Sequence, residues 1–313
     1  MPFSLVTGGG GFIGSHLVDA LLARGDKVRV LDNFSSGKLE NLQHNIEKIE
    51  LITGDLCDSA ILSAAVEGVD LIFHEAAFVS VPQSMEDPES CFDINVNGTG
   101  KMLSAARAAG VKRVVLASSA AIYGENDSVP LSEDEDPDPV SPYAASKLIN
   151  EIYARLFTTD LGLDVVALRY FNVFGPRQNP ASDYAAVIPI FISALENEGE
   201  PVIFGDGLQS RDFVYVSDIV QANLLAAESV QAPGNVINIC SGQEINLLDL
   251  LETLAIIYNR KIQPEFKEVR PGDINRSLGD PRKAQALLGF SSITSVADGL
   301  EQTAAWMKIS RSV

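Results

Sequence analysis

Short apolar runs alternate with amphipathic stretches along the first 174 residues. Apolar runs bounded by glycine or polar residues predict buried strands, and apolar residues spaced three and four apart predict helices between them. The predicted strands are Phe3–Thr7, Val28–Leu31, Glu50–Thr53, Leu71–His74, Arg113–Ser118 and Asp164–Tyr170. The predicted helices are Gly14–Arg24, Ser59–Val66, Pro88–Ala109 and Pro142 to about Asp160. This alternation indicates an α/β fold built on a doubly wound parallel sheet.

The pattern loosens after Gly175, where loops rich in proline, glycine and charge separate the elements. We predict a first domain of residues 1–174, with a return segment near 211–234, and a smaller, mostly α/β lobe of residues 175–313. That lobe would pack at the carboxyl ends of the strands, where open α/β sheets bind ligands. Its predicted elements are helices Ala185–Asn197, Val216–Glu228, Leu247–Tyr258 and Val296–Met307 and strands Pro201–Phe204 and Asn235–Ile239.

Composition narrows the class of protein. The chain has 313 residues, of which 46% are hydrophobic, which suffices for a large core. Its formal charge of −19 argues against binding nucleic acid or an anionic membrane. The three cysteines lie far apart without metal-ligand spacing, which predicts no metal site and a reducing cytoplasm. We see no signal peptide at the start and no apolar run of about 20 residues, so we expect no membrane span.

A glycine-rich turn, Gly8-Gly-Gly-Gly11-Phe-Ile-Gly14, joins the first predicted strand to the first predicted helix. Such glycines let the backbone approach a pyrophosphate at the helix N-terminus. Asp32 ends the second strand, 18 residues after Gly14, where a carboxylate can accept hydrogen bonds from ribose hydroxyls and repel a 2′-phosphate. The set predicts a Rossmann-type site for NAD rather than NADP. Asp55 and Leu56 end the third strand and either meet the adenine or merely cap the strand.

Tyr143 and Lys147 are four residues apart in a predicted helix and therefore share a face. A Lys ammonium and a nicotinamide cation nearby would lower the pKa of the phenol, so that Tyr143 could act as a base near neutral pH. Ser119 follows a predicted strand and could relay a proton. Taken alone, the pair could be an exposed Tyr and Lys, and Ser119 a turn residue.

Taken together, the glycine turn, Ser119, Tyr143 and Lys147 resemble the extended short-chain dehydrogenase/reductases of the NAD-dependent epimerase/dehydratase family. Within it, the chain is most similar to UDP-glucose and UDP-N-acetylglucosamine 4-epimerases. The resemblance covers nearly the whole chain. Further matching motifs are Asp32-Asn-Phe, His74-Glu-Ala-Ala77, Asn95-Val-Asn-Gly-Thr99, Tyr170-Phe-Asn-Val-Phe-Gly175, Ser210-Arg-Asp-Phe213 and Arg270-Pro-Gly-Asp273.

The resemblance implies roles for individual residues. Ser119, Tyr143 and Lys147 would be catalytic, with Tyr143 as the base and Lys147 also binding the cofactor ribose. The expected NAD contacts, including those of the glycine turn, are Gly8, Gly11, Phe12, Ile13, Gly14, Asp32, Asn33, Phe34, Ser35, Ser36, Gly37, Asp55, Leu56, Ala76, Ala77, Asn95, Ser118, Tyr143, Lys147 and Phe171. The expected UDP-sugar contacts are Ser80, Ser119, Tyr143, Asn172, Val187, Phe204, Arg211, Arg270, Asp273 and Ser277. Arg211 and Arg270 could instead form surface ion pairs in so acidic a chain.

Two features separate the reactions of this family. Dehydratases that resemble this chain carry Asp-Glu after the catalytic hydroxyl, whereas this chain has Ala120 and Ala121, which argues against dehydration and less firmly against decarboxylation. A bulky Tyr at the position of Ser277 would restrict the site to plain hexoses. The small Ser277 therefore predicts C4 epimerisation of UDP-N-acetylglucosamine/N-acetylgalactosamine as well as UDP-glucose/galactose, unless Ser277 is only an exposed loop residue.

Three further expectations stay open. A UDP-uronate 4-epimerase or another nucleotide-sugar oxidoreductase is the alternative enzyme, for which Arg177 is the candidate carboxylate ligand. A catalytically silent NAD-binding redox sensor is the non-enzyme alternative. The helix after Pro88 and the helix with Tyr143 resemble the pair that forms a four-helix interface in the family, which predicts a homodimer.

Overall fold

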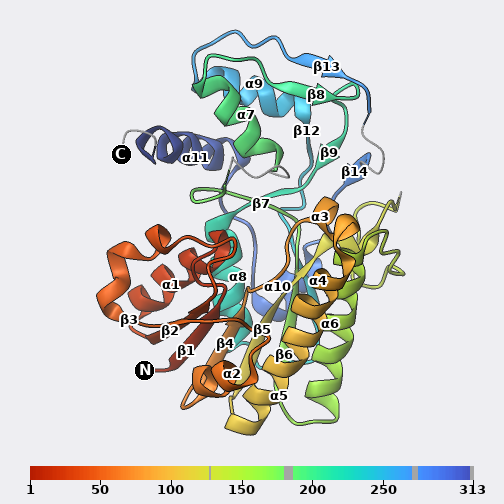
Figure 1. Ribbon diagram of the computed structural model, residues 1–313. Coiled ribbons are helices and arrows are strands. Elements are labelled where there is room, and N and C mark those ends of the chain that lie inside the picture. The colour runs from red at the N-terminus through yellow and green to blue at the C-terminus, as the bar shows by residue number, and fades with distance from the viewer. Residues whose placement is uncertain (127, 180–185, 270–273, 311–313) are drawn as a thin grey trace.

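The computed structural model describes residues 1–126, 128–179, 186–269 and 274–310 (Figure 1). In this part of the chain, the main sheet has seven parallel strands. In spatial order they are β3 (Ile49–Thr53), β2 (Lys27–Asp32), β1 (Phe3–Thr7), β4 (Leu71–His74), β5 (Arg113–Ser119), β6 (Asp164–Tyr170) and β11 (Val236–Ile239). The order reverses between β1 and β4, and a crevice at such a reversal is where doubly wound sheets bind ligands. The predicted fold class is confirmed.

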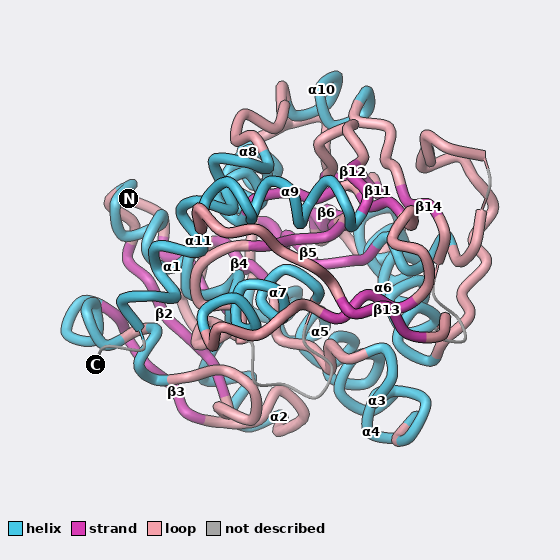
Figure 2. Tube along the Cα trace, turned by 90° about the horizontal axis from the view of Figure 1, so that it is seen from above, coloured by secondary structure: helices cyan, strands magenta, loops and turns pink. Residues whose placement is uncertain are grey.

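Helices cover both faces of this sheet, as Figures 1 and 2 show. One face carries α2 (Ser59–Val66), α5 (Thr99–Ala109) and α6 (Pro142–Thr159), and the other carries α1 (Phe12–Arg24) and α8 (Val216–Glu228). Side chains of β5 alternate between the two cores: Val114 and Leu116 pack on one side, and Val115 and Ala117 on the other. A strand that is buried on both faces consists of consecutive apolar residues. These strands could therefore be predicted from the sequence.

The smaller lobe lies above the carboxyl ends of the strands in Figure 1. Its core joins α7 (Val187–Glu196), α9 (Leu247–Ile257) and α11 (Val296–Ser310), with β8 (Val202–Phe204) paired to β13 (Glu265–Lys267). Short strands connect this lobe to the sheet. They are β7 (Asn172–Phe174) with β10 (Phe213–Tyr215), and β12 (Ile245–Asn246), β9 (Ser210–Arg211) and β14 (Arg276–Ser277).

Several elements differ from the sequence prediction. The predicted helix Pro88–Ala109 comprises α4 (Pro88–Phe92), a wider π-helical turn over Asp93–Gly98, and α5. Three elements were not predicted as helices: α3 (Val81–Glu86), α10 (Arg282–Leu288) and the 3₁₀ helix Ala120–Tyr123. Two more 3₁₀ helices, Leu39–Asn41 and Gln43–Lys48, precede β3.

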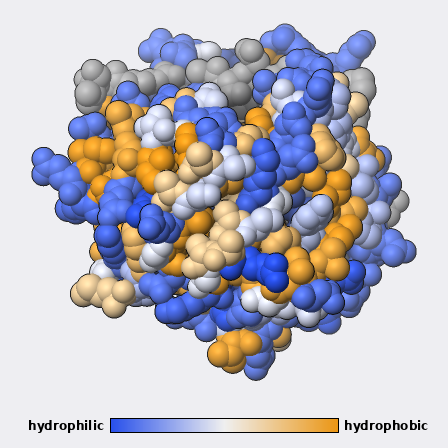
Figure 3. All heavy atoms as spheres, turned by 60° about the horizontal axis from the view of Figure 1, so that its bottom comes forward, coloured by the Kyte–Doolittle hydropathy of each residue, from blue (hydrophilic) through white to orange (hydrophobic). Residues whose placement is uncertain are grey.

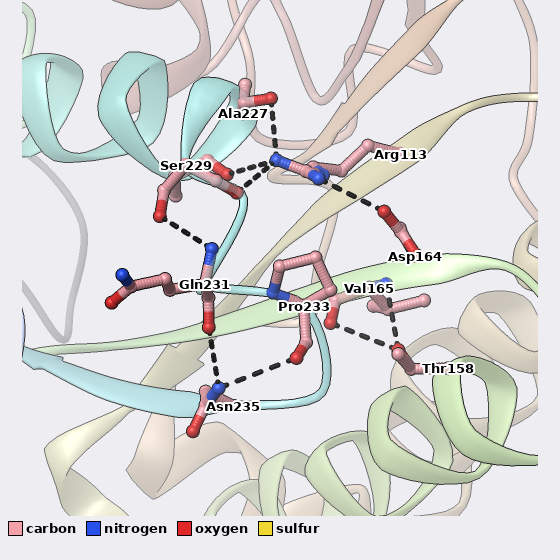
Figure 4. Close-up of polar contacts among 10 residues, drawn as sticks. Arg113, Thr158, Asp164, Val165, Ala227, Ser229, Gln231, Pro233 and Asn235 are labelled. Atoms are coloured by element: carbon pink, nitrogen blue, oxygen red, sulfur yellow. Dashed lines mark hydrogen bonds and ion pairs between the residues drawn. The ribbon is translucent and has the colours of Figure 1, made fainter. Parts of the chain in front are cut away.

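Arg113 fastens the end of α8 to the sheet (Figure 4). From the start of β5, its Nη1 donates to the carbonyl oxygens of Ala227 at 3.0 Å and Ser229 at 2.6 Å, and its Nη2 donates to Asp164 at 3.0 Å. The chain then continues into β11, which pairs with β6. Segments more than a hundred residues apart are thus joined beside the strand that carries Ser119.

The surface mixes polar and apolar areas. On the face in Figure 3, hydrophobic patches lie among more numerous hydrophilic residues. Among the described residues, no helix combines the length and apolar character that crossing a bilayer requires.

Candidate functional site

The glycine turn is shaped by backbone contacts that other residues would not permit. Gly8 has φ +69°, its N–H donates to the Leu31 carbonyl at 2.8 Å, and its carbonyl accepts from Gly11 N at 3.0 Å. A Cβ on Gly14 would lie 2.2 Å from the Gly8 oxygen. The N-cap of α1 is Gly11, which has no side chain to cap the helix. The first N–H groups of α1 are therefore available to an anion such as a pyrophosphate, and the turn fits a dinucleotide.

Asp32 holds the next loop against this turn. Its Oδ2 accepts from Gly10 N at 2.8 Å and its Oδ1 accepts from Phe34 N at 2.7 Å. A carboxylate has about four acceptor positions, so acceptor capacity is left for ribose hydroxyls. Gly37 packs on Gly10 so closely that a Cβ would lie 2.9 Å from the Gly10 carbonyl carbon. The predicted cofactor residues 32–37 thus form one unit with the glycine turn.

Several of the other predicted cofactor residues are already engaged or buried within the protein. Asn33 donates to Asp55 at 2.9 Å, and Leu56 is buried. Asn95 is also buried, and its amide binds both the N–H and the carbonyl of Phe78, at 2.7 and 3.0 Å. Asn95 therefore fixes the backbone that follows Ala76 and Ala77. Ser35 and Ser36 lie in the loop that Asp32 holds.

Tyr143 and Lys147 lie together at the start of α6. Ser141 caps this helix through Ala144 N at 3.2 Å, and Ser84 accepts from Tyr143 N at 3.2 Å. The Lys147 ammonium lies 5.8 Å from the centre of the Tyr143 ring and donates to the Ala117 carbonyl at 2.9 Å. The shared face predicted from the spacing is present, and Lys147 is buried at the end of β5.

The electrostatics of Tyr143 differ from the prediction. Burial raises the pKa of the Tyr143 phenol, and its hydrogen bond with Ser119 offsets this only in part. Burial also lowers the pKa of Lys147 to about 8, although nearby carboxylates raise it. In the protein without NAD, burial therefore outweighs the groups that favour the phenolate, since spacing along the helix does not reveal the cost of desolvation. The lowering predicted for Lys147 and a nicotinamide cation acting together stays a prediction.

A buried ion pair lies behind these residues. Arg169 donates twice to Glu151, at 2.8 Å each, and Ser118 donates to the same carboxylate at 2.5 Å. The Ser118 hydroxyl is therefore used within the protein. Glu151 was not predicted as part of the site. It follows Lys147 by four residues, and this spacing could have placed it on the same face of the helix. Ser119, by contrast, lies at the end of β5, where its Oγ accepts from Ala121 N at 3.2 Å.

Three of the predicted sugar-nucleotide residues, Asn172, Arg211 and Ser277, lie on the short strands that join the sheet to the lobe. The Asp212 carbonyl accepts from both the backbone and side chain of Asn172, at 3.0 and 3.2 Å. Ser277 pairs with Arg211 through β14 and β9, and both are half-buried. Phe171 is buried against Tyr123, and Phe204 and Val187 belong to the lobe. Ser80 caps α3 through Gln83 N at 3.2 Å. Arg270 and Asp273 lie outside the described residues.

Arg177 was the candidate ligand for the carboxylate of a uronic sugar, but its side chain binds a carboxylate of the protein. Its Nη2 binds Asp19 of α1 at 2.6 Å, and the adjacent Pro176 carbonyl binds His16 at 3.0 Å. This side chain fastens the loop after β7 to α1.

Comparison with known proteins gives the family. Residues 4–240 match the model of the NAD dependent epimerase/dehydratase family. This chain belongs to that family. A UDP-glucose 4-epimerase of Mycolicibacterium smegmatis is 38% identical over 97% of this chain and 98% of the relative.

Solved structures agree with this family over the whole chain. A UDP-N-acetylglucosamine 4-epimerase of Methanobrevibacter ruminantium, in complex with UDP-N-acetylmuramic acid, is 44% identical with a TM-score of 0.95, covering 99% of both chains. A Thermus thermophilus UDP-glucose 4-epimerase in complex with NAD is 35% identical with a TM-score of 0.90, covering 98% of this chain and 99% of the other. These proteins are isomerases, and this chain is an enzyme of their group with NAD as its cofactor.

Proposed function

We propose that this enzyme inverts C4 of UDP-sugars, with UDP-N-acetylglucosamine/N-acetylgalactosamine as substrates and UDP-glucose/galactose also accepted. The supporting observation is a cluster of three side chains: Ser119 at the carboxyl end of β5, and Tyr143 and Lys147 near the start of α6. The same protein has a glycine turn that fits NAD. Ala120 and Ala121 follow Ser119 in a 3₁₀ helix and have no group that could transfer a proton. The site is therefore equipped for hydride transfer without elimination of water.

The residues divide the reaction between them. When bound, NAD supplies the hydride acceptor and donor for C4 of the sugar. Tyr143 removes the C4 hydroxyl proton, with Ser119 as relay, and Lys147 holds the ribose and contributes positive charge. Since burial raises the pKa of Tyr143, the positive charge near the ring has to overcome that cost before the phenolate forms.

Inversion then requires a 4-keto sugar to turn over while its nucleotide stays bound. Arg211 is proposed to hold the diphosphate together with Asn172, because a guanidinium matches phosphate oxygens. The same roles remain predictions for Arg270 and Asp273. Arg211 and Ser277 are paired in β9 and β14. The residue proposed to bind the diphosphate and the residue proposed to limit the size of the sugar therefore belong to one small sheet.

The preference for N-acetylated sugars is supported by Ser277 and by a relative. Ser277 is small and half-buried, which leaves room where a Tyr would not. The Methanobrevibacter structure, named as a UDP-N-acetylglucosamine 4-epimerase, is also the relative with 44% identity described above. A UDP-glucuronic acid 4-epimerase of Bacillus cereus is 31% identical, but the pairing of Arg177 with Asp19 argues against a uronate site here.

A substrate panel tests the proposal. Purified enzyme with NAD is incubated separately with each N-acetylated, plain and uronic UDP-sugar, and the products are identified by sugar-specific NMR. We expect interconversion of the N-acetylated pair and the plain pair. The Tyr143→Phe variant should lose roughly 100- to 10,000-fold in kcat because the base is removed. Undiminished turnover by this variant would refute the assignment of Tyr143, and no turnover of any sugar by wild type would leave the redox-sensor alternative.

We also propose a homodimer formed through α4 and α6. Phe92, Ile152, Tyr153 and Leu156 are large hydrophobic residues with 40–48% of their surface exposed on these helices. A cytoplasmic location stays a prediction from sequence.

A further inference from the structure

Glu75 is an acidic side chain that the mechanism above does not use. It directly follows β4, at the carboxyl end of the sheet. The Tyr170 hydroxyl donates to its Oε1 at 2.8 Å, and Asn223 Nδ2 donates to the Tyr170 oxygen at 2.7 Å. Because Asn223 supplies the proton for that second bond, the hydroxyl proton of Tyr170 is directed at Glu75. Strand β6 and helix α8 thus hold Glu75 as an acceptor, which suits a carboxylate.

Glu75 is linked to both ends of the proposed cofactor site. Its backbone packs on the glycine turn, where a Cβ on Gly8 would lie 2.9 Å from the Glu75 carbonyl carbon. The charge of Glu75 also raises the pKa of both Tyr143 and Lys147, so all three groups interact electrostatically. NAD has to extend from the glycine turn to Tyr143, so we expect its nicotinamide end to lie near Glu75.

We propose that Glu75 is the counter-charge of the bound nicotinamide, an electrostatic residue that keeps the cofactor oxidised between turnovers. The inference rests on the NAD site and on the proposed role of Tyr143. The nicotinamide ring carries a positive charge that is lost when it gains a hydride. A fixed carboxylate therefore stabilises the oxidised form more than the reduced form. A 4-epimerase needs this bias, since it begins and ends each cycle with the oxidised cofactor.

The charge of Glu75 also has a pH range. Burial raises its pKa to about 7, against the opposing effects of Tyr170 and Lys147. The titratable groups that face it are Tyr170 from β6 and Tyr143 and Lys147 from α6, while α8 contributes the neutral Asn223. Without NAD, Glu75 therefore takes up a proton as pH falls below about 7, and a bound nicotinamide cation would move this loss of charge to lower pH.

The test is the midpoint potential of the bound cofactor. NAD-loaded wild type and Glu75→Gln are titrated with a redox mediator in the absence of sugar, and absorbance of the reduced nicotinamide is followed. We expect the variant to favour the reduced form by about tenfold, which is ~30 mV upward for a two-electron couple. The gap should close at a pH below 7, because wild type then loses the same charge and the bound cation moves that protonation to lower pH.

Three companion variants separate charge from structure. Glu75→Asp keeps the charge and should keep the wild-type potential. Tyr170→Phe removes the orienting hydroxyl and should give a smaller shift in the same direction. Glu133→Gln removes another carboxyl whose pKa burial raises, one bonded to Asn238 N rather than facing Lys147, and should leave the potential unchanged. An unchanged potential in folded Glu75→Gln, or an equal shift in Glu133→Gln, overturns the proposal. Since no sugar is present, failure of the substrate panel would not produce either result.

Discussion

The size of the side chain at Ser277 can be tested against the choice of sugar. Replacing it with Tyr should lower kcat/KM for the N-acetylated pair by roughly 100-fold or more, because the ring would fill the space proposed for the acetamido group. The plain hexoses should still turn over. Steady-state assays on both pairs measure this, with Ser277→Ala as the control that stays small. Equal losses on both pairs would mean that Ser277 is not the limiting residue.

Residue by residue, contacts could be predicted from sequence better than protonation states could. The i, i+4 spacing correctly placed Tyr143 and Lys147 on one face of α6. It could not reveal that burial raises the pKa of Tyr143, because desolvation depends on every element around it. Glu75 was missed for a related reason: its partner Tyr170 is 95 residues away, and nothing local marks the contact.

At the scale of the elements, one buried carboxylate, that of Asp212, holds together the segments around β9, β12 and β14. Asp212 is fully buried and accepts from Ser241 N, Ser241 Oγ, Gly242 N and Gly279 N at 2.7–3.3 Å. These bonds tie β9 to the loops before β12 and after β14. In Asp212→Asn the amide N–H groups would face donors, so we expect a loss of about 1–3 kcal/mol in the free energy of unfolding. We also expect weaker substrate binding, since Arg211 is adjacent.

The same residue gives a pH dependence with a definite sign. Burial raises the pKa of Asp212 from 3.8 to about 6, despite its four donors. The folded state therefore binds this proton more tightly, so its stabilising contribution is complete below pH 4 and is lost as pH rises through 6. The free energy of unfolding of wild type should therefore fall as pH rises from 4 through 6, by an amount that Asp212→Asn, which cannot titrate in this range, does not show. Denaturant unfolding at several pH values measures this, with the exposed Asp134→Asn as control; a gap that widens with pH would contradict it.

Most strands of two or three residues escaped the sequence prediction at this scale, although β8 was predicted as Pro201–Phe204. The strands β9, β12 and β14 are too short to show any alternation, and each exists because distant segments pair. The long buried strands and the helices around them carry their own periodicity and were found nearly to the residue. The residues proposed to bind sugar were recognised through motifs, but their gathering at this junction could not be predicted from local pattern.

For the whole molecule, the exposed apolar face of α4 and α6 predicts self-association. The double variant Ile152→Glu, Leu156→Glu should convert a dimer to a monomer at micromolar concentration, because two charges would be buried against the partner copy. Sedimentation equilibrium measures the mass. Ile256→Glu on α9 is the matched control, being 77% exposed on the smaller lobe. A wild-type monomer, or a double variant that stays dimeric, would contradict the proposed interface.

The late position of β11 in the chain has a consequence for biosynthesis. A ribosome that has released residues 1–174 has supplied six of the seven strands, but neither α8 nor the strand that pairs with β6. Until residue 239 emerges, the nascent sheet has an open edge beside β6 and a bare apolar surface that α8 later covers. Arg113 can bind the carbonyl oxygens of Ala227 and Ser229 only after those residues have emerged. A truncated gene ending at residue 174 should therefore yield an aggregation-prone product rather than a free-standing nucleotide-binding module.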